Sequence, residues 1–206
     1  MKKALLLIFT FLMSYSYGQE NKIEMISKLD MPPMGSREFI LEAFQGIEKI
    51  DLTFTNSEKL IGKNYKIVIR KYKNGKVEIE KVAKDTKKNE DPKIGKDFKF
   101  SIVAQQLLSN EKITFAFSNS HNKNIFDVNK KYKDNTFSLR EISDQKPIEI
   151  QIGKEFQIAF ITPPNDNEEK GALGYCEVTK GYIDIEKWYK QYEIDEFFLI
   201  FLTIED

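Results

Sequence analysis

Residues 197–204 read FFLIFLTI, and this run decides the fold of the chain. An uninterrupted apolar run rich in aromatic and β-branched side chains predicts a strand that is covered on both faces. At eight residues it is too short to span a bilayer, which needs about 20 residues. We therefore expect a sheet that has this strand near its middle.

Upstream of this run, apolar and polar residues alternate with a period of two, which is the spacing of side chains on one face of a strand. The alternation recurs at 50–54, 65–69, 77–79, 98–102, 113–117, 148–152 and 156–160. Turn-forming residues separate these segments at intervals typical of antiparallel sheets. The sequence predicts an all-β protein, an antiparallel β-sandwich of jelly-roll or immunoglobulin-like type.

Asn74-Gly75 lies between two of these segments and is a strong signal for a hairpin. A three-residue loop over 73–75, with Gly75 in the left-handed conformation, would place Ile69 opposite Ile79. A two-residue loop would place Ile69 opposite Glu80 instead. Because a shift of one residue changes which faces meet, the apolar match favours the longer loop.

One short helix is expected before the last strand, over residues 184–193. Ile185, Trp188, Tyr189 and Tyr192 follow helical spacing, and Asp184 is placed to cap the first turn. The three aromatic residues could form a sugar-stacking platform, but at this spacing beside a buried strand we expect them in the core.

The chain of 206 residues divides into three parts. Residues 1–18 have the basic start, short apolar stretch and small final residue of a signal peptide, with cleavage expected before Gln19. Residues 19–35 are expected to form a leader segment, and residues 36–206 the β-sandwich domain. We expect an exported protein, periplasmic or extracellular, with no membrane span after signal removal.

Few residues in this sequence could carry catalysis or hold a metal. It has one cysteine, Cys176, and one histidine, His121. These numbers exclude an intramolecular disulfide framework and leave little room for a histidine-based triad. Residues 166–177 partly resemble a calcium loop, but Lys170 occupies a position that requires an oxygen ligand. The sequence therefore offers no catalytic, cofactor-binding or metal-binding residues.

Charge is balanced overall, with 32 basic and 32 acidic residues, but it is unevenly distributed. Residues 63–99 hold thirteen basic and six acidic residues, whereas residues 182–206 hold two basic and seven acidic residues. Export makes nucleic acid an unsuitable partner for the basic block. We expect an envelope protein or an anionic polymer to bind through the Lys-rich 63–99 region, unless its lysines only keep an exposed strand edge soluble.

The C-terminal third resembles small exported Bacteroidota proteins of unassigned function. The residues that carry this resemblance are GYCE at 174–177, EKWY at 186–189 and FFLIF at 197–201. Cleavage before a glutamine, as expected here at Gln19, is common among such proteins. The group carries no known catalytic residues, so the resemblance implies an exported protein and no particular activity.

Taken together, these features favour an exported non-enzymatic binding protein of the cell envelope. The alternative is a glycan-acting hydrolase that uses a pair of carboxylates, although no spacing in the sequence selects a pair. A groove holding two close acidic side chains and an exposed Trp188 would favour the hydrolase. A buried Trp188 would favour the binding protein.

Overall fold

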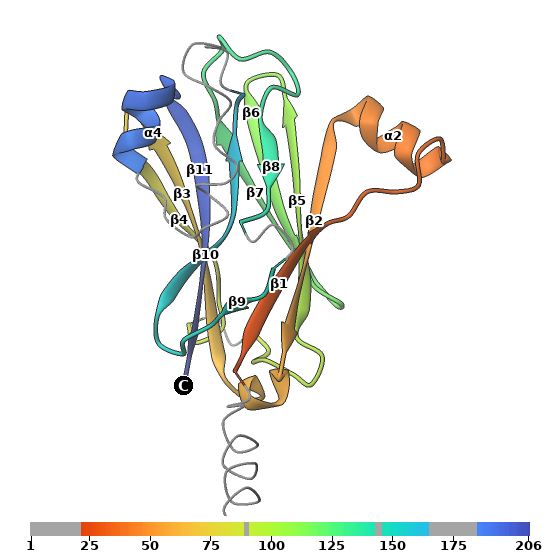
Figure 1. Ribbon diagram of the computed structural model, residues 1–206, viewed down its shortest axis with the longest axis vertical. Coiled ribbons are helices and arrows are strands. Elements are labelled where there is room, and N and C mark those ends of the chain that lie inside the picture. Colours follow the sequence, from red (N-terminus) through yellow and green to blue (C-terminus); the bar gives the residue numbers. More distant parts are fainter. Residues whose placement is uncertain (1–21, 89–90, 143–145, 165–184) are drawn as a thin grey trace, which may run out of the picture.

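The structure is a computed structural model that describes residues 22–88, 91–142, 146–164 and 185–206. Two antiparallel sheets, A and B, pack face to face (Figure 1). The predicted all-β sandwich is confirmed. In the described part of the chain, no helix is both long and apolar enough to cross a bilayer.

Sheet A contains six of the described strands and sheet B five. The strands of sheet A are β1 (Glu24–Leu29), β2 (Ile47–Thr55), β5 (Lys99–Leu107), β6 (Asn110–Ala116), β7 (His121–Asp127) and β9 (Ile148–Glu149). Those of sheet B are β3 (Asn64–Lys73), β4 (Lys76–Asp85), β8 (Ser138–Arg140), β10 (Glu155–Thr162) and β11 (Glu196–Glu205). The helices are α2 (Arg37–Gln45), the short 3-10 turn η1 (Ser57–Leu60) and α4 (Ile185–Tyr192). The strand orders are β7-β6-β5-β2-β1-β9 and β4-β3-β11-β10-β8.

Strand β11, which contains the FFLIFLTI run, lies in the middle of sheet B between β3 and β10, as predicted. Its residues alternate between the inner face of the sandwich and the outer face that α4 covers. On the outer face, Phe197 stacks on Tyr72 of β3 with ring centroids 5.0 Å apart. Trp188 of α4 lies 5.3 Å from the same phenylalanine. The expected helix before the last strand is therefore present, and it covers the outer face of sheet B at the end where β11 begins.

The core lies between the two sheets and is built from the alternating residues that the sequence singled out. Ile50 and Leu52 of β2, Ile102 of β5 and Phe115 of β6 are all fully buried. Each of these strands presents one face to the core, which explains their alternating pattern. The segment 148–152 departs from its prediction, because only Ile148–Glu149 form a strand there.

Part of the expected leader belongs to the sandwich. Strand β1 pairs with β2, and the side chain of Met25 is fully buried in the core. The sequence Glu-Met-Ile-Ser at 24–27 alternates only weakly in polarity, so periodicity did not reveal the strand. Strand β7 was missed for a related reason: this edge strand is mostly polar, with buried residues only at Asn124 and Phe126.

The hairpin joining β3 and β4 has a two-residue turn, so the predicted three-residue loop is wrong. Asn74 and Gly75 both have positive φ, 51° and 75°, and Lys73 pairs with Lys76. Such a turn matches the twist of the adjoining strands. A β-bulge in β4 then shifts the register, so that Arg70 lies opposite Glu80.

Replacing Gly75 tests this turn. Gly75→Val should lower the free energy of unfolding by ~1–2 kcal/mol, because a β-branched residue is strained at a φ of 75°. Gly75→Asn should lower the free energy of unfolding by less, since asparagine tolerates the left-handed backbone conformation. Urea denaturation of the three proteins measures the difference, and equal stability of all three would contradict the assigned turn.

Candidate functional site

Helices α2 and α4 lie at the same end of the sandwich, which we call the helical end (top of Figure 1). The loop of residues 128–137, which joins β7 to β8, also lies there. Two features occupy this end: a network of buried charges between the sheets, and a pocket beside it.

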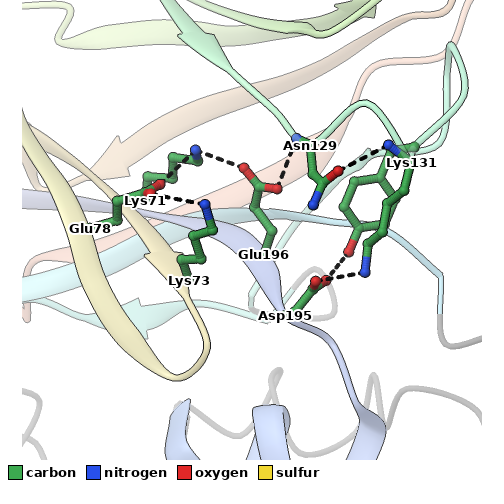
Figure 2. Close-up of polar contacts among 8 residues, drawn as sticks. Lys71, Lys73, Glu78, Asn129, Lys131, Asp195 and Glu196 are labelled. Atoms are coloured by element: carbon green, nitrogen blue, oxygen red, sulfur yellow. Dashed lines mark hydrogen bonds and ion pairs between the residues drawn. The ribbon is translucent and has the colours of Figure 1, made fainter.

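The network is centred on the amino group of Lys71, which lies between two carboxylates (Figure 2). Its Nζ is 2.7 Å from an oxygen of Glu196 and 2.7 Å from an oxygen of Glu78. The side chains of Lys71 and Glu196 are only 6% and 2% exposed. Lys73, in contrast, contacts Glu78 from the surface at 3.3 Å. Lys71 and Glu196 therefore form a buried ion pair that joins β3 to β11.

The environment of Lys71 keeps it charged. Burial by itself lowers the pKa of this amine, but hydrogen bonds and attraction from Glu196 and Glu78 outweigh burial, so the pKa of Lys71 lies above its usual value. The pKa of Glu78 lies below its usual value, mainly because Lys71 donates a hydrogen bond to it. Both shifts favour the ionised form of the pair at neutral pH.

The same network holds the loop of residues 128–137. The second oxygen of Glu196 accepts a hydrogen bond from the backbone N–H of Asn129 at 3.0 Å. Asp195 accepts a hydrogen bond from the hydroxyl of Tyr132, and its Oδ2 lies 2.6 Å from Nζ of Lys131. Figure 2 shows these contacts converging on two successive residues of the chain, Asp195 and Glu196. Strand β11 thereby fixes the position of this loop.

A pocket of about 490 Å³ lies against this loop. Its described lining residues are Lys131, Tyr132, Lys133, Asn135, Thr136, Ser138, Arg140, Thr162, Pro163 and Pro164. The volume is within the range of small-molecule sites, roughly 300–1,000 Å³. We call this cavity the basic pocket, because its described lining includes three cationic side chains, four hydroxyl groups and no carboxylate.

Two of these cations form ion pairs with carboxylates that are not among the described lining residues. Lys131 contacts Asp195, and Arg140 lies 3.9 Å from Glu48, but neither carboxylate lines the pocket. No ion pair with a described residue involves Lys133. The pocket therefore presents positive charge and hydroxyl donors, a combination suited to an anionic ligand.

Two carboxylates, Glu48 and Glu111, face the inside of the sandwich near this pocket. Glu48 accepts hydrogen bonds from the backbone N–H of Leu139 and from the hydroxyl of Ser138, the latter at 3.2 Å. Glu111 on β6 is 1% exposed, and its Oε2 has no hydrogen-bond partner among the described residues. Burial, with repulsion from Glu48, raises the pKa of Glu111 to about 8. Glu111 is thus largely protonated at neutral pH.

Strand pairing places the basic and acidic segments of the sequence side by side, where their charges partly neutralise each other. Strand β3, in the basic 63–99 block, lies beside β11, in the acidic 182–206 segment. Among the described residues, seven of the thirteen basic side chains in the block make ion pairs, three of them with the C-terminal segment. The Lys-rich block is therefore partly neutralised within the fold.

The exposed lysines that remain lie mostly at the end opposite the helical end. Lys93 and Lys99 are exposed and, with Lys84, line a second cavity of about 300 Å³. Phe98 and Phe117 contribute its apolar surface. Lys84 is already paired with Asp91 at 3.0 Å. We call this cavity the opposite-end pocket.

The other residues considered from the sequence lie as follows. Trp188 and Tyr192 are 2% and 6% exposed, which confirms their core positions, whereas Tyr189 is 36% exposed. His121 is exposed at the start of β7. Cys176, Asp184 and the residues of the calcium-like loop lie outside the described residues. Within the described ranges, no group of three or more histidine, cysteine or acidic residues could hold a metal.

The basic pocket was not anticipated from the sequence. Its lining comes from a polar loop and from the ends of β8 and β10, which are brought together only by the pairing of distant strands. Comparisons with protein-family models, curated proteins and solved structures give no match to this chain. The site is therefore interpreted from its geometry alone.

The buried ion pair gives a test by double substitution. Lys71→Met should lower the free energy of unfolding by about 3–5 kcal/mol, because it leaves Glu196 buried without its cation. The double variant Lys71→Met, Glu196→Gln should recover most of this loss, since glutamine can still accept from the N–H of Asn129. The surface substitution Lys73→Met is the control and should lose about 1 kcal/mol or less. Equal losses for Lys71→Met and Lys73→Met in urea denaturation would contradict this account.

Glu111 makes stability depend on pH. Its pKa rises from an ordinary 4.5 to about 8 on folding, so between these values the folded chain binds more protons than the unfolded chain. Its contribution to stability is complete below pH 4.5 and is lost as pH rises to 8, by up to about 1.4 kcal/mol per pH unit. Glu111→Gln should remove this dependence and stabilise the protein at pH 8, as measured by thermal unfolding across this pH range. Glu58→Gln, at an exposed position, is the control. An unchanged pH profile in Glu111→Gln would show that Glu111 ionises normally.

Proposed function

We propose that this protein is an exported, non-enzymatic binding protein of the cell envelope that takes an anionic ligand in the basic pocket. The ligand class is a carboxylated, sulfated or phosphorylated polymer or one of its end groups. Export rests on the signal peptide expected over residues 1–18 and on the resemblance to small exported Bacteroidota proteins.

The observation that carries this proposal is the composition of the pocket lining. Lys131, Lys133 and Arg140 supply positive charge, and Asp195 and Glu48, which pair with Lys131 and Arg140, are not among the described lining residues. Arginine and hydroxyl groups bind anionic oxygens through charge-assisted hydrogen bonds. The ion pairs of Asp195 and Glu196 with the neighbouring strands and loop position this lining before any ligand arrives, which favours binding because little ordering is then required.

The observations favour a binding protein over the alternative, a glycan-acting hydrolase. Such a hydrolase needs two carboxyl groups that flank the substrate. Glu48 and Glu111 are the best pair in the described chain, and Glu111 has the raised pKa of a general acid. However, Glu111 is 1% exposed and lines none of the described pockets, so a substrate could not contact it. Trp188 is also buried rather than available for sugar stacking.

The opposite-end pocket is the second candidate for the ligand-binding site. If it binds the ligand, an anionic polymer or an acidic partner protein contacts the protein through the 63–99 region. Lys93 and Lys99 line the pocket, Lys96 is exposed between them in the sequence, and no ion pair with a described residue involves these three lysines. Asp97 also lines this pocket, which weakens its preference for anions relative to the basic pocket.

A binding assay with matched polymers separates the two sites. Dextran sulfate is the anionic probe, and neutral dextran of the same length is its control. The protein starting at Gln19 should bind dextran sulfate with an affinity that falls as salt rises. The double variant Lys133→Gln, Arg140→Gln should weaken binding at least tenfold in isothermal titration calorimetry, with thermal stability measured in parallel.

Two further variants complete the assay. Lys154→Gln removes an exposed lysine outside the basic pocket and should leave affinity unchanged. The triple variant Lys93→Gln, Lys96→Gln, Lys99→Gln should have little effect. If the triple variant abolishes binding and the double variant does not, the ligand binds the opposite-end pocket instead. Binding that does not change with salt, with the double variant or with the triple variant would contradict anion recognition.

A further inference from the structure

The segment between β1 and β2 carries an exposed apolar surface. Met31, Met34, Ile40, Leu41 and Phe44 are 61%, 86%, 59%, 46% and 84% exposed. We call these five residues the α2 patch, since three lie on α2 and two precede it. Helix α2 projects from the body of the sandwich at the helical end (Figure 1). None of its nine residues is buried.

Helix α2 is nevertheless well defined by its ends. The hydroxyl of Ser36 accepts a hydrogen bond from the N–H of Phe39 at 3.1 Å, and Gly46 ends the helix in the left-handed conformation. An isolated helix of nine residues is marginal in water, so tertiary packing normally supplies its stability. Here the described contacts hold mainly the C-terminal end, where the side-chain amide of Gln105 donates to the carbonyl of Gln45 at 2.9 Å. The apolar surface of α2 lacks the packing that a helix of this length needs.

The area of the α2 patch matches half of a dimer interface. At roughly 200 Å² for a large side chain, the five residues expose about 700 Å². The largest apolar patch on a typical monomer is about 300–600 Å². Two such patches in contact would bury about 1,400 Å², which is within the range of about 1,200–2,000 Å² for specific interfaces.

The charges of α2 argue against a membrane surface as the occupant. Its polar residues include one basic side chain, Arg37, and two acidic ones, Glu38 and Glu42. Helices that lie on membranes carry a polar face rich in lysine and arginine. A second copy of the chain, in contrast, presents an apolar face of the same size and needs no net charge.

We propose that the protein forms a two-fold symmetric dimer in which the α2 patches of two copies pack against each other. An antiparallel arrangement of the two α2 helices satisfies the symmetry, because each copy then contributes the same surface. Leu41, near the middle of α2, lies close to the two-fold axis. Arg37 lies beside Phe44 of the partner subunit, where its guanidinium can contact the aromatic ring. This dimer does not depend on the ligand proposed for the basic pocket.

Sedimentation velocity of the protein starting at Gln19 tests the dimer over roughly 0.1–100 µM, which brackets a dissociation constant of about 1 µM. We expect the mass of two chains at the higher concentrations. Phe44→Asp should raise the dissociation constant at least thirtyfold, because it places a charge in the interface. Ile125→Asp is the matched control, since Ile125 is 56% exposed on β7, away from α2, and its replacement should leave the dimer intact.

A cross-linking experiment covers the case in which Phe44→Asp perturbs the fold. Leu41→Cys in a Cys176→Ser background carries a single thiol, and mild oxidation should give a disulfide-linked dimer in high yield. A cysteine at Ile125 in the same background should cross-link much less. A monomer at all concentrations, or a dimer that Ile125→Asp disrupts and Phe44→Asp does not, would overturn the proposal.

Discussion

The pairing of β11 with β3 is the constraint on which the rest of the structure depends. Ten residues of each strand are in register, and they bring the basic 63–99 block beside the acidic C-terminal segment. The same pairing places Lys71 and Glu196 at one end of the inner face, where both side chains are buried. From that ion pair, hydrogen bonds extend to Asn129 and fix the loop that forms one wall of the basic pocket. Removing this strand pair would remove both the centre of sheet B and the site.

The sequence was informative wherever burial alone decides the structure. The FFLIFLTI run and the alternation at 50–54 or 113–117 predicted strands correctly, because every second residue there must be apolar to fill the core. Weakly alternating or mostly polar segments did not reveal their strands, as in β1 and β7, where neighbouring strands supply most of the packing. The turn at 74–75 was placed correctly but its length was not, and a bulge in β4 moves the register further from the predicted one, so that Ile69 lies opposite Lys81. A bulge depends on tertiary contacts and leaves no local signal.

The candidate site was harder to predict for a physical reason. Its lining residues come from 131–140 and 162–164, and none belongs to a motif that requires particular neighbours. The charge pattern directed attention to 63–99, where many lysines proved to have acidic partners on β11 or within the block. Net charge of a segment predicts a binding surface only when the adjacent strand is neutral. Here the adjacent strand carries the opposite charge, and Lys133, which makes no ion pair with a described residue, lies in a loop of ordinary composition.

The central position of β11 also determines when this protein can finish folding. Strand β1 pairs with β2, β5 pairs with β6, and β6 pairs with β7. Pairs between strands that are close in sequence form quickly. Strand β3, however, must wait for residues 196–205, more than 120 positions later, before its second edge is paired. Until that segment pairs, sheet B lacks its central strand. The buried charges at the helical end, and with them the wall of the basic pocket, then assemble in the last step of folding. The loop that Glu196 holds therefore reaches its final position only after β11 has paired with β3.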